Sequence, residues 1–368
     1  MNRFVMGFLA AFGAASGCFP APANVVSDWD DKASSAIVDG ARKGPASACA
    51  YLAYVTVAMY DIVASIDGKF RPFSVSVTAP KGASEDAAAT VATYEVLVHY
   101  FPLQQTSLDA EEISSLSVVR DGQSRDDGVK VGRAVAEGWI ATRADDALEA
   151  RVPYVQGHGP GIWEPVPNVP APGAVMTPPP VEPWFASFRR FALSSPEQFF
   201  SVLERPYVLE SAEWAADFNL TKDHGAPKSA VRMVRQTETG LFWTDPCAAQ
   251  YMRTIRGLIG TARAARLSAM AFVTLAEAFP ASVSAKHTFR FWRHYAAIRN
   301  AAETHISAAT TPDVLAYLGG GATKEGEGAG FTPGTGVENP DAYASSRAIS
   351  PEVLAYLGRE AAAAAAGQ

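Results

Sequence analysis

Long apolar stripes at helical spacing constrain the fold of this chain more than any other feature of its sequence. The stretch from Pro45 to Asp67 is densely apolar, and Ser84 followed by Glu85 and Asp86 has the pattern of a helix start. Further stripes recur at three- and four-residue spacing around Val91–Phe101, Val131–Thr142, Pro246–Ala278 and Ala281–Ala302. No stretch shows the alternating pattern and Asn-Gly or Asp-Gly turns of strands. The pattern predicts a mainly α fold.

The charge balance argues against one class of partner. The 368 residues include 31 Lys+Arg and 38 Asp+Glu, which gives a net charge of −7. A general nucleic-acid-binding protein needs a basic surface to neutralise phosphates. We therefore expect no nucleic-acid partner.

The first 23 residues have the pattern of a secretory signal peptide. Arg3 precedes an uncharged apolar run from Phe4 to Ala15, and Ala21-Pro22-Ala23 offers small residues for cleavage. This predicts a secreted or periplasmic protein that begins near Asn24, without a membrane-spanning segment. A lipoprotein signal that ends at Cys18 and an ordinary buried N-terminal helix are the alternatives.

Two cysteines remain if Cys18 belongs to the signal. Cys49 and Cys247 allow one disulfide in an exported protein. Two separate buried thiols are the other interpretation, and spacing alone leaves both open.

The composition changes between residues 151 and 191, where ten prolines are interleaved with aromatic side chains. Proline breaks helices, whereas a disordered linker would lack the aromatic residues. We expect an ordered, extended strap packed over the helical body. The aromatic residues are Tyr154, Trp163, Trp184, Phe185 and Phe188.

Residues 311–368 read as a separate tail. Eight glycines fall in the 18 positions 319–336, and the near copies 312–319 and 351–358 match at seven of eight places. Short helices that flank a glycine-rich stretch bury little surface. We expect this tail to be loosely attached and to be cut first by proteases.

Cations gather from Ala281 to Ala302 without any acid. Lys286, Arg290 and Arg293 would share one face of a continuous helix. Such a cluster suits a tetrahedral oxyanion such as phosphate or vanadate. Ion pairs with acids on neighbouring helices are the alternative, and the candidates are Asp217, Glu238 and Glu277.

The same segment resembles the first active-site motif of the vanadium-dependent haloperoxidase and type 2 phosphatidic acid phosphatase superfamily. That motif is K-x6-R-P, and the matching residues are Ala285-Lys286-His287, Phe291-Trp292-Arg293-His294 and Ala297-Ile298-Arg299. Other stretches resemble the bacterial haloperoxidase-like branch, in the same order along the chain. They are Ala58–Asp61, Tyr94–Leu97 with Tyr100–Pro102, Gly161–Pro165, and Gln236–Thr239 with Phe242-Trp243.

The resemblance implies a helical bundle over residues 24–310 that holds vanadate and oxidises halide with peroxide. It assigns Lys286 and Arg293 to oxyanion binding, and Arg290 adds a neighbouring charge. The small-molecule partners would then be peroxide, halide and an oxidised substrate.

The rest of the family pattern is missing. His294 replaces the motif proline, no Pro-Ser-Gly-His occurs, and His305 is the last histidine of the chain. Ser346-Arg347 begins like the third motif but lacks its glycine and histidine. His287 and His294 are the remaining candidates for acid–base catalysis.

Three interpretations follow from this incomplete motif set. The chain is an active haloperoxidase-like enzyme, or a catalytically degenerate relative that acts as a binding or scaffold protein. In the third, a second subunit of a homo-oligomer supplies the missing histidines.

Overall fold

The computed structural model describes residues 24–300, with gaps at 156, 165–181, 196–197, 199–205, 210, 226–228, 243–245 and 257–260. The predicted signal, the tail at 311–368, His305 and Ser346-Arg347 lie outside the described residues. What the sequence predicts for them stays a prediction.

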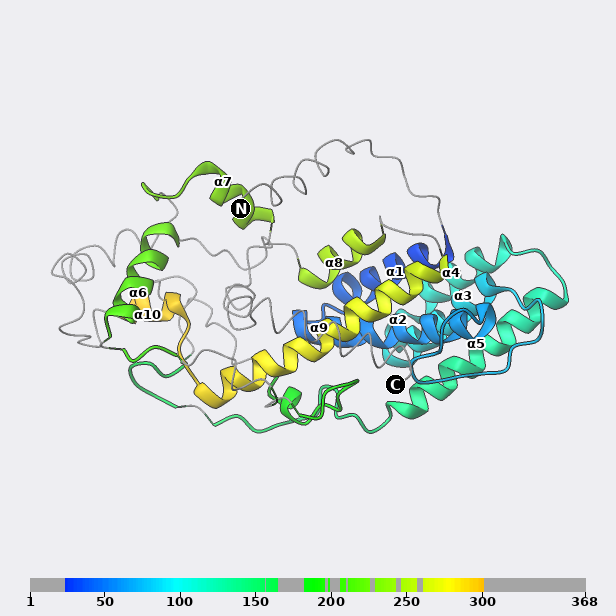
Figure 1. Cartoon of the computed structure of the whole chain (residues 1–368), viewed down its shortest axis with the longest axis horizontal. Helices are drawn as coiled ribbons and strands as arrows, with labels where there is room; N and C mark the ends of the chain where they lie inside the picture. Colours follow the sequence, from blue (N-terminus) through cyan, green and yellow to red (C-terminus); the bar gives the residue numbers. More distant parts are fainter. Residues whose placement is uncertain are drawn as a thin grey trace, which may run out of the picture.

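The described chain is a helical bundle, as the apolar stripes predict. Its centre is α2 (Pro45–Asp67), which packs along the much longer α9 (Thr261–Phe289) and against α3 (Glu85–Tyr100), as Figure 1 shows. The other helices are α1 (Val25–Ser34), α4 (Gln105–Ser117), α5 (Gln123–Thr142), α6 (Ala212–Gly225), α7 (Val234–Phe242), α8 (Cys247–Arg256) and α10 (His294–Asn300). Shorter turns are the π-helical Ser35–Gly40 and the 3₁₀ turns Pro102–Gln104 and Pro183–Ala186. In the described part of the chain, extended pairing is limited to one bridge between Ile162 and Phe291.

Helix α2 begins and ends where its sequence predicts. Pro45 occupies the first turn, and Gly68 ends the helix in the left-handed conformation with its N–H donated to the Ala64 carbonyl at 3.0 Å. Every residue from Ala46 to Ala64 is buried. Its apolar sequence is therefore explained by a position inside the bundle.

Two helices are long and apolar enough to cross a membrane, on length and composition alone. They span Pro45–Asp67 and Arg263–Phe289, and 89% and 67% of their most apolar windows are buried inside the protein. Core helices of this kind meet the same criteria without any bilayer.

Helices α3 and α5 approach each other closely at two glycines of α5. A Cβ on Gly132 would lie 2.5 Å from the Ala88 carbonyl oxygen, and one on Gly128 would lie 2.5 Å from the Ser84 carbonyl oxygen. Ser84 also caps α3, as predicted, by accepting a hydrogen bond from Ala87 N at 3.2 Å. Because Gly128 and Gly132 have no Cβ atom, α3 and α5 can approach this closely.

The apolar stripes at Pro246–Ala278 and Ala281–Ala302 do not correspond to two helices. Helix α9 runs through Pro280 and ends at Phe289, while α8 is a separate helix that ends at Arg256. Proline inside a helix removes one backbone hydrogen bond. Its neighbours Ala278 and Ala281 are buried, so packing on both sides stabilises the helix across the proline.

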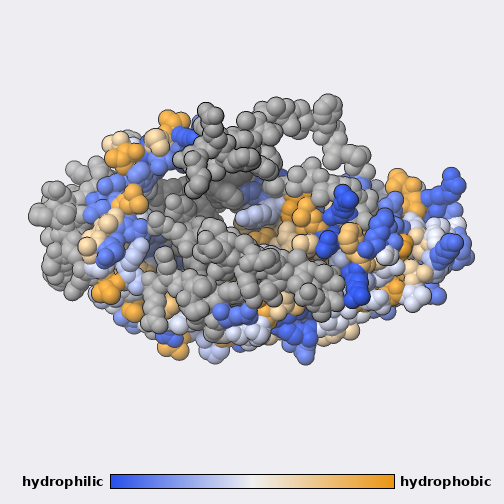
Figure 2. All heavy atoms as spheres, viewed as in Figure 1, coloured by the Kyte–Doolittle hydropathy of each residue, from blue (hydrophilic) through white to orange (hydrophobic). Residues whose placement is uncertain are grey.

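Helix α9 connects two apolar cores of unequal size. The large core surrounds α2, and a small one is formed by Trp214, Ala215, Phe218, Trp292 and Ala297 at α6 and α10. In Figure 1 the yellow α9 leaves the bundle and leads towards α6 and α10. On the face drawn in Figure 2, hydrophobic surface lies in small separate patches, several of them at the end that carries α6 and α7.

Candidate functional site

The predicted cation cluster lies where α9 ends, and its geometry differs from the prediction. Lys286 is in the last turn of α9, and Arg290 N still donates to the Lys286 carbonyl at 2.8 Å. Arg290 then adopts a φ of 48°, in the left-handed region, and the chain leaves the helix axis. Lys286, Arg290 and Arg293 therefore do not share one helical face, and that expectation is wrong.

The helix ends because the next residues pair with the strap. Trp163 N donates to the Arg290 carbonyl at 2.8 Å, and Trp292 N donates to the Gly161 carbonyl at 3.1 Å. Trp292 is buried in the small core, so its burial and these two hydrogen bonds stabilise the extended segment. The structure thus joins two stretches that carry the family resemblance, residues 161–163 and 290–293.

Two aromatic rings lie between His287 and Arg293. The Arg293 guanidinium carbon is 5.4 Å from the centroid of the buried Trp163 ring. Tyr154 packs edge-on against Trp163 at 6.0 Å and against His287 at 5.9 Å. His287 and Arg293 therefore contact the two ends of one aromatic pair. His294, the other candidate, is half-buried at the start of α10.

A carboxylate that the sequence did not indicate interacts electrostatically with Lys286. Glu182 accepts hydrogen bonds from Ser47 N at 2.9 Å and from the Ser47 hydroxyl. Burial raises the pKa of Glu182, and the Ser47 hydrogen bonds and the Lys286 charge act in the opposite direction. Glu182 thus compensates part of the Lys286 charge, and no sequence pattern indicated it because it follows the proline-rich part of the strap.

Glu277, one of the predicted ion-pair partners, is used elsewhere. Its carboxylate accepts hydrogen bonds from the backbone N–H groups of Phe191 and Ala192, the second at 3.0 Å. Burial raises the pKa of Glu277, and those backbone hydrogen bonds lower it in part. Glu277 therefore anchors the strap to α9.

The site suits an oxyanion by its charge. Across the described residues, no three His, Cys, Asp or Glu side chains form a group that could hold a metal ion. His99 is exposed, and His158 is 79% exposed with Nδ1 3.4 Å from Glu164. The described residues therefore supply cations for a tetrahedral anion and no histidine in a metal-binding group.

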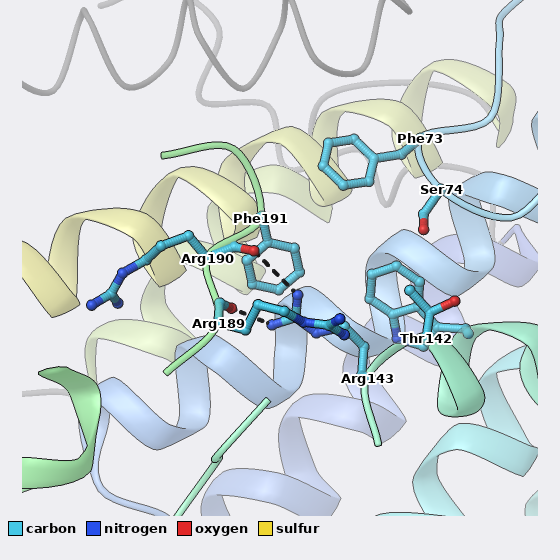
Figure 3. Close-up of a pocket in the computed structure, with 8 residues that line it drawn as sticks. Phe73, Ser74, Thr142, Arg143, Arg189, Arg190 and Phe191 are labelled. Carbon is cyan, nitrogen blue, oxygen red and sulfur yellow. Dashed lines mark hydrogen bonds between the residues drawn. The ribbon is translucent and has the colours of Figure 1, made fainter. Parts of the chain in front are cut away.

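A hollow of about 210 Å³ lies between the end of α5 and the strap (Figure 3). No sequence pattern indicates this hollow, because its residues come from distant segments of the chain. They are Phe73, Ser74, Trp139, Thr142, Arg143, Arg189, Arg190 and Phe191.

Arg143 lines this hollow and connects α5 to the strap. Its guanidinium bonds Asp146 at 3.0 Å and the Arg189 carbonyl at 2.6 Å, and it lies 4.4 Å from the centroid of the Phe191 ring. Figure 3 shows the Arg190 side chain extending away from Arg143. Burial lowers the pKa of Arg143 to about 10 and raises that of Asp146 to about 6, so both are charged at neutral pH. This is a structural pair that fastens the strap to α5.

No protein-family model and no curated protein matches the sequence significantly. Solved structures do. A bacterial vanadium-dependent iodoperoxidase aligns with a TM-score of 0.61 at 18% identity, over 79% of this chain and 76% of that one. A bacterial vanadium-dependent chloroperoxidase aligns in its holo form with a TM-score of 0.53 at 16% identity, over 74% and 68% of the two chains. Its apo form gives 0.51 at 15% identity, over 71% and 66%.

The chain therefore has the fold of the bacterial vanadium-dependent haloperoxidases. The mainly α class and the resemblance stated from the motifs are confirmed at this level. At 15–18% identity the likeness concerns the fold and not the reaction.

Proposed function

From a fold shared with bacterial vanadium-dependent haloperoxidases, we propose that this chain binds a tetrahedral oxyanion, vanadate or phosphate, where α9 ends. Lys286 and Arg293 supply the main positive charge, and the exposed Arg290 adds to it. The observation that carries the proposal is the pairing of residues 161–163 with 290–292, which brings Arg293 over Trp163.

The aromatic contact supports anion binding because it holds the Arg293 guanidinium beside the candidate site. A ring face attracts a guanidinium without neutralising its charge. Arginine also presents a planar fork that matches two oxygens of a tetrahedral anion.

The proposed binding is weak. Glu182 competes for Lys286, and a site held together by charge alone weakens as salt is added. We expect the affinity for vanadate and phosphate to fall steadily with ionic strength.

Oxidation of halide by peroxide would need a histidine as the general acid or base. His287 is the better placed of the two candidates, because it contacts the aromatic pair that Arg293 also contacts. We expect bromide turnover far below that of proteins with the complete motif set.

Titration calorimetry with orthovanadate and with phosphate tests the binding proposal. Removing one charge-assisted hydrogen bond costs about 1.5–3 kcal/mol, so Lys286→Ala and Arg293→Ala should each lose about tenfold or more in affinity. Arg133→Ala is the matched control, because Arg133 is a half-exposed arginine of α5 paired with Glu95 at 2.9 Å. Equal binding by all four proteins would reject the site.

A bromide-oxidation assay with vanadate and peroxide tests the catalytic part. Brisk turnover that His287→Ala or His294→Ala abolishes would establish that histidine as the acid–base group. If neither oxyanion binds to the wild type, the alternative of a binding or scaffold protein with this fold gains support.

Export remains part of the proposal. It rests on Arg3, the apolar run that follows and Ala21-Pro22-Ala23. N-terminal sequencing of the protein from its producing cells should give a start near Asn24, and an intact Met1 would contradict it.

A further inference from the structure

Cys49 and Cys247 lie together although they come from different parts of the chain. Cys49 is in α2 and is fully buried, while Cys247 is the first residue of α8 and is partly exposed. Both thiols are free, and Cys247 packs against the apolar core that contains Cys49, where α8 contacts α2. Of the two interpretations that spacing left open, the structure shows the unbonded one, with Cys49 buried and Cys247 partly exposed.

The two sulfurs have unequal surroundings. The hydrogen bond from Cys49 and the backbone N–H groups at the start of α8 lower the pKa of Cys247, against the effect of its burial. Burial above all, and then the contact with Cys247, raises the pKa of Cys49. Cys247 thus has both the lower pKa and the greater solvent exposure, so it should be the more reactive thiol.

We propose that Cys49 and Cys247 form a peroxide-oxidisable dithiol, in which Cys247 reacts first and Cys49 closes a disulfide between α2 and α8. The proposal rests on the packing of the two residues where α2 meets α8, on the buried position of Cys49 and on the partial exposure of Cys247.

The chemistry balances with peroxide as the oxidant. The Cys247 thiolate attacks one peroxide oxygen, the O–O bond breaks, and a sulfenic acid forms on Cys247. The hydroxide that leaves takes up the proton that the Cys247 thiol lost on ionisation and becomes water. The Cys49 sulfur then attacks the Cys247 sulfur, the S–O bond breaks, and the hydroxide that leaves takes up the Cys49 proton as water. Two thiols are oxidised to one disulfide, and one peroxide is reduced to two waters.

The dithiol is next to a residue of the candidate oxyanion site. The Glu182 carboxylate acts on both cysteines and raises their pKa values, and Glu182 is the same group that interacts with Lys286. Ser47, which donates to Glu182, is two residues before Cys49 in α2. Oxidation of the two cysteines to a disulfide would therefore remove two titratable thiols that interact with Glu182.

The experiment uses the full chain in a Cys18→Ala background, without vanadate, treated with hydrogen peroxide. Intact mass should fall by two hydrogen atoms, and peptide mapping should find one Cys49–Cys247 disulfide. In Cys49→Ala the reaction should stop at a Cys247 sulfenic acid, which dimedone traps. In Cys247→Ser, Cys49 should react at least about tenfold more slowly, because it is buried and its thiol is less acidic.

Two results would overturn the proposal. One is that both thiols stay reduced in peroxide while circular dichroism shows the wild-type fold. The other is that Cys49 in Cys247→Ser is oxidised as fast as Cys247 in Cys49→Ala. The disulfide should form equally in Arg293→Ala, so a failure of the oxyanion site and a failure of this proposal are distinguishable.

Discussion

Arg293 lies over the face of Trp163, with 5.4 Å between the guanidinium carbon and the ring centroid. The contact depends on backbone pairing, since Trp163 N donates to the Arg290 carbonyl and Trp292 N donates to the Gly161 carbonyl. A short stretch of strap therefore positions a cation at the end of the longest helix.

Replacing Trp163 should weaken oxyanion binding without removing any charge. A cation–π contact contributes about 0.5–1 kcal/mol at a partly exposed site, so Trp163→Leu should lose roughly two- to fivefold in phosphate affinity. Trp163→Phe keeps a ring face and should lose less. Calorimetry measures both, and an affinity unchanged in Trp163→Leu would show that the ring does not position Arg293 for binding.

Removing the charge of Glu182 should act in the opposite direction. Glu182→Gln keeps an oxygen that can accept from Ser47 but no longer competes with the anion for Lys286. We expect phosphate affinity to rise several-fold at low salt and the gain to shrink as salt is added. The double variant Glu182→Gln, Lys286→Ala should show no gain, and a gain that persists there would assign the effect to another cation.

Asp61 should make the protein less stable as pH rises towards neutrality. Its buried carboxylate accepts hydrogen bonds from Ser74 N at 3.1 Å and Val75 N at 2.8 Å, yet burial raises its pKa from 3.8 to about 7. Between these two values the folded state holds a proton that the unfolded state has lost. The free energy of unfolding should therefore decrease as pH rises from 4 to 7, by up to about 4 kcal/mol for this group.

Urea unfolding at several pH values, with Asp61→Asn beside the wild type, measures that contribution. The variant should show a shallower decrease over this range. Asp146, Glu182 and Glu277 have raised pKa values for the same reason, so part of the slope should remain. An identical slope in both proteins would contradict the assignment to Asp61.

Adding one methyl group to Gly132 should destabilise the contact between α3 and α5. Its Cβ would lie 2.5 Å from a backbone oxygen that cannot rotate away, so the helices must separate. Overpacking of this kind costs about 1–3 kcal/mol.

Gly240→Ala in α7 is the matched control, because nothing lies within 4 Å of its Cβ. Both variants gain the same helix propensity of alanine, about 1 kcal/mol, so the difference between their unfolding free energies measures the clash. Equal stability would show that α3 moves freely.

Local signals predicted the early helices well. Proline and glycine mark the two ends of α2, and Ser84 with two acids after it marks the start of α3. In each case the residue that ends or caps the helix affects only the backbone groups a few positions away in the sequence. Such information is present in a single sequence.

Tertiary contacts decided what the sequence did not predict. Packing carries α9 through Pro280, and the left-handed turn at Arg290 occurs without a glycine. Motif resemblance selected residues 161–165 and 285–299, but only the fold joins them by backbone pairing. Likewise, the packing of α2, α8, α9 and the strap brings Cys247 against the core that contains Cys49 and places the Lys286 charge within electrostatic range of Glu182.

The two unequal cores at the ends of α9 have a consequence for how a bound anion would be detected. Regions with few buried contacts open locally at lower free energy than the global unfolding of a domain. The small core of Trp214, Ala215, Phe218, Trp292 and Ala297 should thus open without the bundle around α2. A ligand stabilises only the state that it binds. An oxyanion held by Arg293 would slow amide hydrogen exchange at the end of α9 and in α10, while the melting temperature of the large core stayed the same.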